Sequence, residues 1–452
     1  MDKLNIAYLM GGGATSVMNL AILGIYDQAK ESEKIGKISG IWDGTEGLVY
    51  DSLFKRSINI LDLDRSTLRK ISNMPGASLR SGRRLPDDKQ FTKIVKQLKK
   101  NKINYLFYHG GNGTALILSR IIKKAHDLDI NLRCIHIPKT IDNDLMGTYF
   151  SPGYGTSAKK VALEAMNLRE SFNASPGIAV FITMGRNAGW LAAAAAAGGA
   201  DLIYFPERPV NLDSFCKQVI AKHIENLAKG RGTVVAVSEG IINKKGEYFA
   251  QIARKELNAT RLSDEYIYTP RLSSAPLDFF LKEKIKEELF ELENLKFFDT
   301  KVRASTLGYG QRENMEVICM TDREVAYETG RYAIKFAVEK KTSVMVGIKK
   351  SEKKRKQKKL ITVKDDVSYL PERLKDISLS ENQWIYEPVN LSKVADFKKD
   401  EVFERKLPDK YINKKGNNVT KKFLKEYLTP IIGPIPKKYD FSKPNLFFRI
   451  KS

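Results

Sequence analysis

The chain has 452 residues, of which 42% are hydrophobic and 10% aromatic, and its 77 Lys and Arg against 53 Asp and Glu give a net charge of +24. This length predicts about three domain-sized units with hydrophobic cores, which excludes a disordered tail, and the positive balance favours anionic partners. Three scattered cysteines argue against a disulfide framework or a cysteine zinc site, and the lack of a signal peptide or a membrane-length apolar run predicts a soluble cytoplasmic protein.

Short runs rich in β-branched residues alternate with amphipathic stretches over the first 350 residues. The runs predicted as strands are 4–9, 105–110, 133–138, 177–185, 202–207 and 233–240. Strands separated by helices predict an α/β fold with mostly parallel sheets and helices on both faces. Because open parallel sheets bind ligands at the carboxyl ends of their strands, each strand end is a candidate ligand position.

Two glycine-rich turns follow predicted strands. Gly11, Gly12 and Gly13 lie between the first strand and a helical stretch over 17–30, and the segment 110–114, GGNGT, lies between a strand over 105–109 and a helix over 115–125. Glycines let the backbone approach a phosphate, and a helix amino terminus supplies free N–H donors. Either turn alone could be only a tight turn, but two in one open sheet favour an extended phosphate ligand.

A pair of carboxylates follows the strand that ends at Pro138. The segment 139–144 reads KTIDND, and an extended backbone there would point Asp142 and Asp144 the same way. Carboxylates beside a bound phosphate hold Mg²⁺ or accept a proton from an attacking hydroxyl. Solvated loop acids are the alternative, and the neighbouring lysine and glycine turns argue against it. Three arginines further along the chain are candidate phosphate contacts: Arg186, Arg303 and Arg312.

These motifs resemble those of the 6-phosphofructokinase family, in particular its branch of pyrophosphate-dependent enzymes and their ATP-using plant and trypanosomatid relatives. The resemblance covers about residues 4–350, through GGATSVMN (12–19), GGNGT, PKTIDND, SPGYGTSAKKVA (151–162), MGRNAGW, VVAVSEG and LGYGQR (307–312). It implies two similar α/β lobes with the active site between them. It also implies transfer of a phosphoryl group to the 1-hydroxyl of fructose 6-phosphate.

The resemblance implies a role for each matching residue. Asp142 is the expected catalytic base, with Lys139 and Gly113 beside the transferred phosphate, and Asp144 and Asn112 are the expected Mg²⁺ ligands. Asn112 stands where many members carry an aspartate, which weakens that ion site. The expected sugar-phosphate contacts are Thr140, Ile141, Asp142, Met184, Gly185, Arg186, Glu239, Arg303, Tyr309 and Arg312, with Arg303 acting from a neighbouring subunit. The expected donor contacts are Gly12, Gly13, Arg80, Arg84 and Gly113.

Two residues bear on the phosphoryl donor. In the family, an aspartate at the position of Gly113 puts a carboxylate where the α-phosphate of ATP would lie, and Gly113 has no such block. Lys139 is typical of the pyrophosphate branch, yet the ATP-using relatives combine this lysine with a glycine. We therefore expect ATP as the donor, with pyrophosphate as the alternative.

The predicted organisation has a donor-phosphate lobe over 1–153, completed by a returning segment at about 310–345, a sugar-phosphate lobe over 154–309, and a Lys-rich C-terminal elaboration over 346–452. The run 349–359 holds eight basic residues in eleven. It is predicted to be a solvated loop, although an inactive polyanion-binding scaffold is the alternative of another class. The expected partners are fructose 6-phosphate and ATP or pyrophosphate, in a homodimer or homotetramer, with no specific nucleic acid and no membrane.

Overall fold

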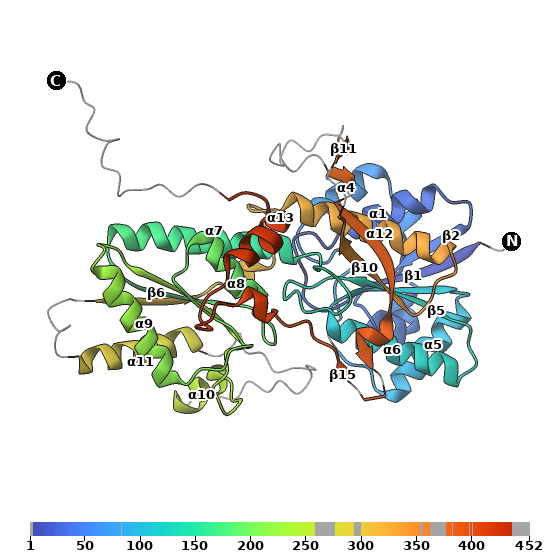
Figure 1. The fold of residues 1–452 in the computed structure, drawn as a ribbon. Helices are drawn as coiled ribbons and strands as arrows, with labels where there is room; N and C mark the ends of the chain where they lie inside the picture. Colours follow the sequence, from blue (N-terminus) through green and yellow to red (C-terminus); the bar gives the residue numbers. More distant parts are fainter. Residues whose placement is uncertain are drawn as a thin grey trace, which may run out of the picture.

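The computed structural model describes residues 3–82, 84–257, 276–292, 300–352, 356–361, 377–381, 383–396, 398–399 and 401–435. These residues form two lobes, and each lobe is a β-sheet between helices (Figure 1). The α/β fold of two lobes with mostly parallel sheets is therefore confirmed. No helix among the described residues has the length and apolar character needed to cross a bilayer.

The first lobe is built on a seven-stranded sheet. From one edge to the other, its strands are β13 (Trp384–Asn390), β10 (Val344–Lys350), β5 (Arg133–Pro138), β4 (Tyr105–Gly110), β1 (Leu4–Met10), β2 (Ile35–Gly40) and β3 (Ile58–Asn59). The strands from β10 to β2 are parallel, whereas β13 and β3 pair antiparallel at the two edges. The carboxyl ends of β1, β4 and β5 therefore lie together and lead into the two glycine turns and the 139–144 loop.

Side chains of the first sheet alternate between two buried faces, as the two-residue period of a strand requires. Helices cover both faces of the sheet. Ile6 and Tyr8 pack against one helical layer, and Ala7 and Leu9 pack against the layer on the opposite face. The first layer contains α1 (Leu20–Lys30), α4 (Arg65–Asn73) and α12 (Met320–Val338). The second contains α2 (Glu46–Val49), α3 (Asp51–Phe54), α5 (Asp88–Lys100) and α6 (Asn112–Asp127).

The second lobe has a four-stranded parallel sheet in the order β7 (Leu202–Tyr204), β8 (Thr233–Ser238), β6 (Gly177–Thr183) and β9 (Lys301–Thr306). One face packs on α7 (Tyr154–Ala174) and α8 (Trp190–Gly198). The other packs on α9 (Leu212–Leu227), α10 (Phe249–Glu256) and α11 (Leu277–Glu291). The carboxyl ends of β6 and β8 lead into the MGRNAGW and SEG motifs.

The C-terminal elaboration is built onto both lobes, as the red segments in Figure 1 show. β11 (Lys356–Ile361) pairs with β12 (Ile377–Glu381), β13 joins the first sheet, and β14 (Ala395–Asp396) and β15 (Glu401–Val402) lie against α6. The π-helical turn Phe423–Leu428 and α13 (Thr429–Ile432) then pack on α7 and α8. The described part of the C-terminal elaboration therefore contacts helices of both lobes.

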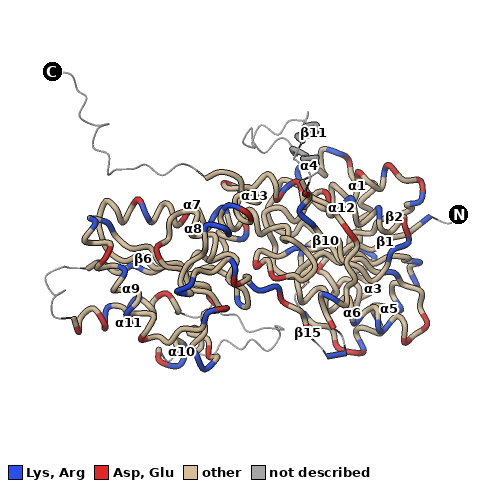
Figure 2. The backbone as a smooth tube through the Cα atoms, in the orientation of Figure 1, with Lys and Arg blue, Asp and Glu red and all other residues tan. Residues whose placement is uncertain are grey.

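The basic run 349–359 differs from the solvated loop that we expected. β10 continues through Lys350, and β11 begins at Lys356, so much of the run is strand. Lys349 Nζ lies 2.6 Å from a Glu387 carboxylate oxygen on the neighbouring strand β13. Residues 353–355 lie outside the described residues. Among the described residues, Lys and Arg are interspersed with Asp and Glu over both lobes (Figure 2).

Helices α1 and α12 approach so closely that glycine is required where they cross. A Cβ atom on Gly24 would lie 2.0 Å from the backbone oxygen of Tyr327, and one on Gly330 would lie 2.1 Å from that of Ala21. Backbone atoms cannot move aside as a flexible side chain would. The two glycines therefore set the spacing of the helical layer over the first sheet.

We predict that Gly24→Ala lowers the free energy of unfolding by about 1–3 kcal/mol, because overpacking outweighs the roughly 0.5–1 kcal/mol that alanine gains in a helix. Urea denaturation measures this change. Gly310→Ala is the control, since a Cβ there meets no atom within 4 Å. An unfolding free energy equal to or above that of the wild type for Gly24→Ala would contradict the close approach.

Candidate active site

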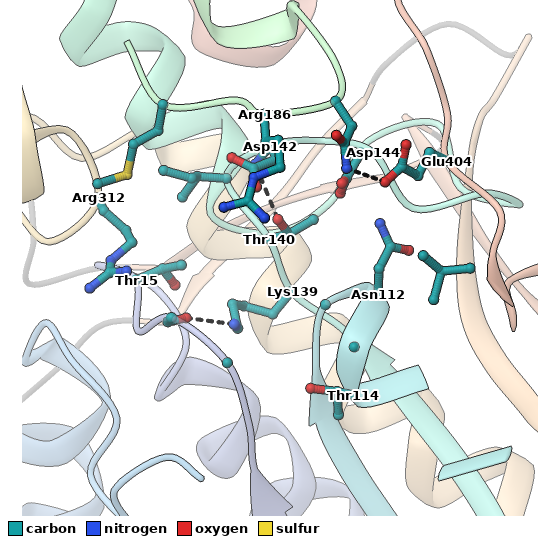
Figure 3. Close-up of a pocket in the computed structure, with 18 of the residues that line it drawn as sticks. Thr15, Asn112, Thr114, Lys139, Thr140, Asp142, Asp144, Arg186, Arg312 and Glu404 are labelled. Carbon is teal, nitrogen blue, oxygen red and sulfur yellow. Dashed lines mark hydrogen bonds between the residues drawn. The ribbon is translucent and has the colours of Figure 1, made fainter. Parts of the chain in front are cut away.

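A cavity of about 340 Å³ lies between the lobes and is lined by residues of both. It contains most of the residues predicted from the sequence: Gly12, Gly13, Asn112, Gly113, Lys139, Thr140, Ile141, Asp142, Asp144, Met184, Arg186, Glu239, Tyr309 and Arg312. Figure 3 shows Asp142 and Arg186 close together, with Asn112 and Glu404 beside Asp144 and with Arg312 on the opposite side. The predicted motifs therefore converge on one site.

Lys139 joins the first glycine turn to the loop after β5. Its Nζ donates hydrogen bonds to the backbone oxygens of Gly11 and Gly13, at 3.1 and 2.5 Å, and the side chain is only 2% exposed. Gly12 adopts a φ of +74°, in the left-handed region that favours glycine. The turn thus brings its backbone and one buried ammonium group to the same end of the cavity.

Asp142 and Asp144 both reach the cavity, but not by the extended backbone that we expected. Asn143 between them adopts a φ of +57°, so the chain turns sharply there. Asn143 is fully buried, donates a hydrogen bond from Nδ2 to the Tyr427 hydroxyl at 2.6 Å, and accepts one from the Ser151 backbone N–H at 3.0 Å. Asparagine tolerates the left-handed conformation better than most residues, and these bonds hold it there.

Burial raises the pKa of both carboxyl groups, and the cations around them oppose this unequally. The pKa of Asp142 is raised by burial, while the positive charges of Arg186, Lys139 and Arg312 act to lower it. The pKa of Asp144 is raised to about 8, first by burial and then by the negative charges of Asp142 and Glu404. Asp142 is therefore the carboxylate that the cations of the cavity help to keep ionised.

The cavity wall formed by the second lobe depends on a close contact between two of its motifs. A Cβ on Gly240 would lie 1.7 Å from the backbone oxygen of Arg186, so only glycine allows the SEG and MGRNAGW turns to touch. The Glu239 N–H donates to the Thr183 oxygen at 2.8 Å. Burial and the charge of Asp142 raise the pKa of Glu239 to about 7, although Arg186 acts to lower it. Glu239 and Arg186 are thus adjacent cavity groups.

The segment 308–312 connects this wall to the first lobe. The Met184 N–H donates to the side-chain oxygen of buried Gln311 at 2.9 Å, while the Arg312 backbone oxygen accepts from the Ser16 N–H at 3.2 Å. The Arg312 guanidinium lies over the Tyr309 ring, 4.7 Å from its centroid. A Cβ on Gly13 would lie 2.6 Å from this guanidinium, so the glycine turn leaves it room.

The residues around Asn112 fit a magnesium ion that takes most of its ligands from phosphate and water. Among the described residues, no group of three or more His, Cys, Asp or Glu side chains is arranged to hold a metal ion. Both polar atoms of the Asn112 amide are buried and have no well-formed hydrogen bond to any of the described residues. The amide nevertheless lies close enough to Asp144 to act to lower the pKa of that carboxyl group. Mg²⁺ is commonly bound by one or two carboxylates plus substrate phosphates.

Comparison with known proteins identifies this arrangement. The sequence pattern of the family described as phosphofructokinase matches residues 5–337. The chain belongs to the phosphofructokinase family. It is therefore a phosphotransferase, and the glycine turns, the 139–144 loop and the MGRNAGW motif all lie within the matched part.

The similar proteins differ in how much of this phosphofructokinase they span. The chain is 30% identical over 442 residues to the pyrophosphate–fructose 6-phosphate 1-phosphotransferase of Rhodospirillum rubrum. This alignment covers 96% of the chain and 95% of the relative. It is 32% identical over 263 residues to the ATP-dependent 6-phosphofructokinase of Erwinia tasmaniensis, covering 57% and 76%. The crystal structure of pyrophosphate-dependent phosphofructokinase from Nitrosospira multiformis has the same fold, with a TM-score of 0.72, 24% identity and coverage of 98% and 95%.

Four predicted site residues do not line the cavity. Gly185 lies behind its wall with a φ of +118°, and its oxygen accepts a hydrogen bond from the Ser238 hydroxyl. Arg80 is exposed and pairs with Asp43 at 3.4 Å, and Arg84 borders a separate small hollow. Arg303 is exposed on β9, and its action in a neighbouring subunit stays a prediction. Arg80 and Arg84 therefore lie outside the cavity that Gly12 and Gly13 line.

Ten residues of the cavity lining were not predicted as site residues: Thr15, Gly82, Leu85, Gly111, Thr114, Leu116, Ile117, Asn187, Val402 and Glu404. Thr15 and Asn187 belong to the quoted motifs, so their proximity could have been inferred. Val402 and Glu404 come from the C-terminal elaboration and carry no motif. The Glu404 carboxylate accepts a hydrogen bond from Asn187 Nδ2, which explains how a residue so distant in sequence reaches the site.

We predict that Glu239→Gln stabilises the ligand-free enzyme in a pH-dependent way. Because the pKa of Glu239 rises from 4.5 to about 7 on folding, the unfolded chain releases this proton first, and wild-type stability falls between those pH values. The variant lacks this loss, so its advantage should grow from pH 4.5 to 7, by at most about 3 kcal/mol, and then level off. Thermal unfolding over this pH range measures it, with exposed Glu291→Gln as the control.

A difference in unfolding free energy that stays constant from pH 4.5 to 8 would contradict the raised pKa of Glu239.

Proposed function

We propose that the enzyme transfers a phosphoryl group from pyrophosphate to the 1-hydroxyl of fructose 6-phosphate, giving fructose 1,6-bisphosphate. The observation that carries this proposal is the convergence, in one cavity between the lobes, of two buried carboxylates with Lys139, Arg186 and Arg312. Catalysis of phosphoryl transfer depends mainly on positioning and on neutralising charge. A cavity with this composition suits two phosphorylated ligands held end to end.

Pyrophosphate is a better-supported donor than the ATP that we expected from the sequence. The relative from Rhodospirillum rubrum, named for pyrophosphate, aligns over nearly the whole chain, whereas the ATP-dependent relative from Erwinia tasmaniensis aligns over 57% of it. The C-terminal segment supplies Val402 and Glu404 to the cavity wall. An alignment that spans this segment therefore compares more of the site than one limited to about half of the chain.

Asp142 is proposed as the general base. Its carboxylate would take the proton of the sugar 1-hydroxyl as that oxygen attacks the nearer phosphorus of pyrophosphate, and the bond to the bridging oxygen would break to release phosphate. The surrounding charges of Arg186, Lys139 and Arg312 act to keep Asp142 ionised despite its burial. A buried carboxylate with a raised pKa is also a stronger base than an exposed one.

The donor phosphates are proposed to lie over the glycine turns. Gly12 would border the phosphates, although its own N–H donates to the Gly82 oxygen. Gly13 and the amino terminus of α6 would offer backbone N–H groups, and Lys139 adds a buried positive charge beside them. Asp144 and Asn112 would hold Mg²⁺ together with the phosphates. When bound, the ion would neutralise charge that develops on the transferred and leaving groups.

The sugar phosphate is proposed to lie on the second-lobe side. Arg186 and Arg312 would contact phosphate oxygens, since a guanidinium matches the planar geometry of such contacts. Glu239 would accept hydrogen bonds from sugar hydroxyls, and Tyr309, Met184, Thr140 and Ile141 would border the ring. Arg303 would act from a neighbouring subunit of a homodimer or homotetramer.

ATP is the second candidate donor, because one observation favours it. A Cβ on Gly113 would meet no atom of the described residues within 4 Å, so nothing at this position blocks a longer phosphate chain.

Because the alignment evidence favours pyrophosphate, we predict that the wild type forms fructose 1,6-bisphosphate from fructose 6-phosphate and Mg²⁺ with pyrophosphate at a much higher kcat/KM than with ATP. Separate assays with each donor, coupled to aldolase, measure the ratio. Turnover with ATP and none with pyrophosphate would reverse the assignment.

We also predict that Asp142→Asn lowers kcat by about 10²–10⁴-fold while binding of fructose 6-phosphate changes little, because the amide cannot accept the proton. Steady-state kinetics and calorimetric titration with the sugar phosphate measure the two quantities. Asp409→Asn, at an exposed position, is the matched control. Full activity in Asp142→Asn would remove Asp142 from the catalytic role.

A further inference from the structure

The C-terminal segment 404–407 lies between the 142–145 loop of the first lobe and the MGRNAGW turn of the second. Glu404 pairs antiparallel with Leu145, and the Arg405 N–H donates to the Asp144 backbone oxygen at 2.7 Å. On the other side, Trp190 Nε1 donates to the Arg405 backbone oxygen at 2.9 Å. A single residue of the segment therefore bonds by its backbone to both lobes.

The Arg405 side chain also contacts residues of both lobes. Its guanidinium lies over the Trp190 ring, 4.2 Å from the centroid, and also faces the Tyr427 ring at 5.4 Å. Nη1 lies 3.1 Å from the Tyr427 hydroxyl and 3.4 Å from the backbone oxygen of Asn143. Arg405 does not line the cavity, so these contacts lie behind the site.

The contacts converge on the turn that separates the two carboxylates. Asn143 has a φ of +57°, and the Tyr427 hydroxyl, which accepts from its Nδ2, donates in turn to the Tyr149 backbone oxygen at 2.8 Å. Arg405, which is partly buried, adds a positive charge beside these groups. Left-handed backbone at a residue other than glycine persists only where its surroundings hold it.

We propose that Arg405 is a positioning residue that holds the turn at Asn143, and with it Asp142 and Asp144, in register with the second lobe. The inference rests on the proposed function for its effect on turnover, but the structural part can be tested without it. Only a planar guanidinium stacks on an indole while donating sideways to two oxygens. Lysine at this position would keep the charge and N–H donors but lose the planar group that stacks on the indole, and methionine would keep neither charge nor donor.

The experiment compares Arg405→Met and Arg405→Lys with Arg208→Met. Arg208 is the matched control, because it is a partly exposed arginine that does not line the cavity. Its Nη2 pairs with Asp409, just beyond the 404–407 segment. We expect Arg405→Met to lower kcat by at least about tenfold, since small displacements of reacting groups cost that much, with each KM within about threefold of the wild type. Arg405→Lys should recover part of the loss, and Arg208→Met should behave as the wild type.

Hydrogen–deuterium exchange gives a readout that does not depend on activity. Peptides covering residues 140–150 should exchange faster in Arg405→Met than in Arg208→Met, while peptides of β1, β4 and β6 exchange as in the wild type. If the wild type proves inactive with both donors, the proposed function fails and this exchange result alone decides the positioning role. If Arg405→Met does not fold, Arg405→Lys is measured in the same way, with smaller changes of the same kind expected.

Two results would overturn the proposal. The first is a kcat for Arg405→Met within twofold of that for Arg208→Met. The second is faster exchange spread evenly over the chain, which would mean that Arg405 supports the fold as a whole and not the turn.

Discussion

Three cations and four carboxylates line one cavity: Lys139, Arg186, Arg312, Asp142, Asp144, Glu239 and Glu404. The protonation state of each carboxyl group depends on the charges of the others. Asp142, Asp144 and Glu239 all have a raised pKa, because burial disfavours their charged forms more than their neighbours favour them. Groups desolvated in this way destabilise the folded chain above their ordinary pKa values. The surrounding structure has to compensate, which it does with two extensively buried sheets. Perturbed carboxylates beside arginines are expected where chemistry takes place.

Close backbone contacts make this charge arrangement possible. Gly240 lies against the backbone of Arg186, and Gly13 leaves space for the guanidinium of Arg312. A side chain at either glycine would push a charged group away from its partners. Gly13 of the first lobe therefore makes room for Arg312, and Gly240 of the second lobe lets the turns of Glu239 and Arg186 lie side by side.

Much of this could be predicted from the sequence. Six strands were found, because runs such as YLFYHG at 105–110 are short, apolar and bounded by glycine or proline, and most site residues followed from the motifs at their ends. Several strands were not predicted. Two of them are β2 and β9, whose sequences IGKISG and KVRAST carry polar residues on partly exposed faces. Asp142 and Asp144 were placed together correctly, but through an extended backbone that Asn143 does not adopt. Glu404 reaches the cavity through contacts between residues more than 200 positions apart, for which a single sequence has no local signal.

Two of the segments that cross between the lobes form hydrogen bonds to both of them, one segment on each side of the site. Around residue 312, Gln311 accepts from Met184 of the second lobe while the Arg312 backbone accepts from Ser16 of the first. Around residue 405, the backbone bonds to Asp144 and Trp190 play the same part. Neither sheet alone contains the complete set of charged groups, so the cavity exists only at the lobe spacing that these crossings allow. A site assembled in this way responds to changes in the connecting segments even where no connecting side chain enters the cavity.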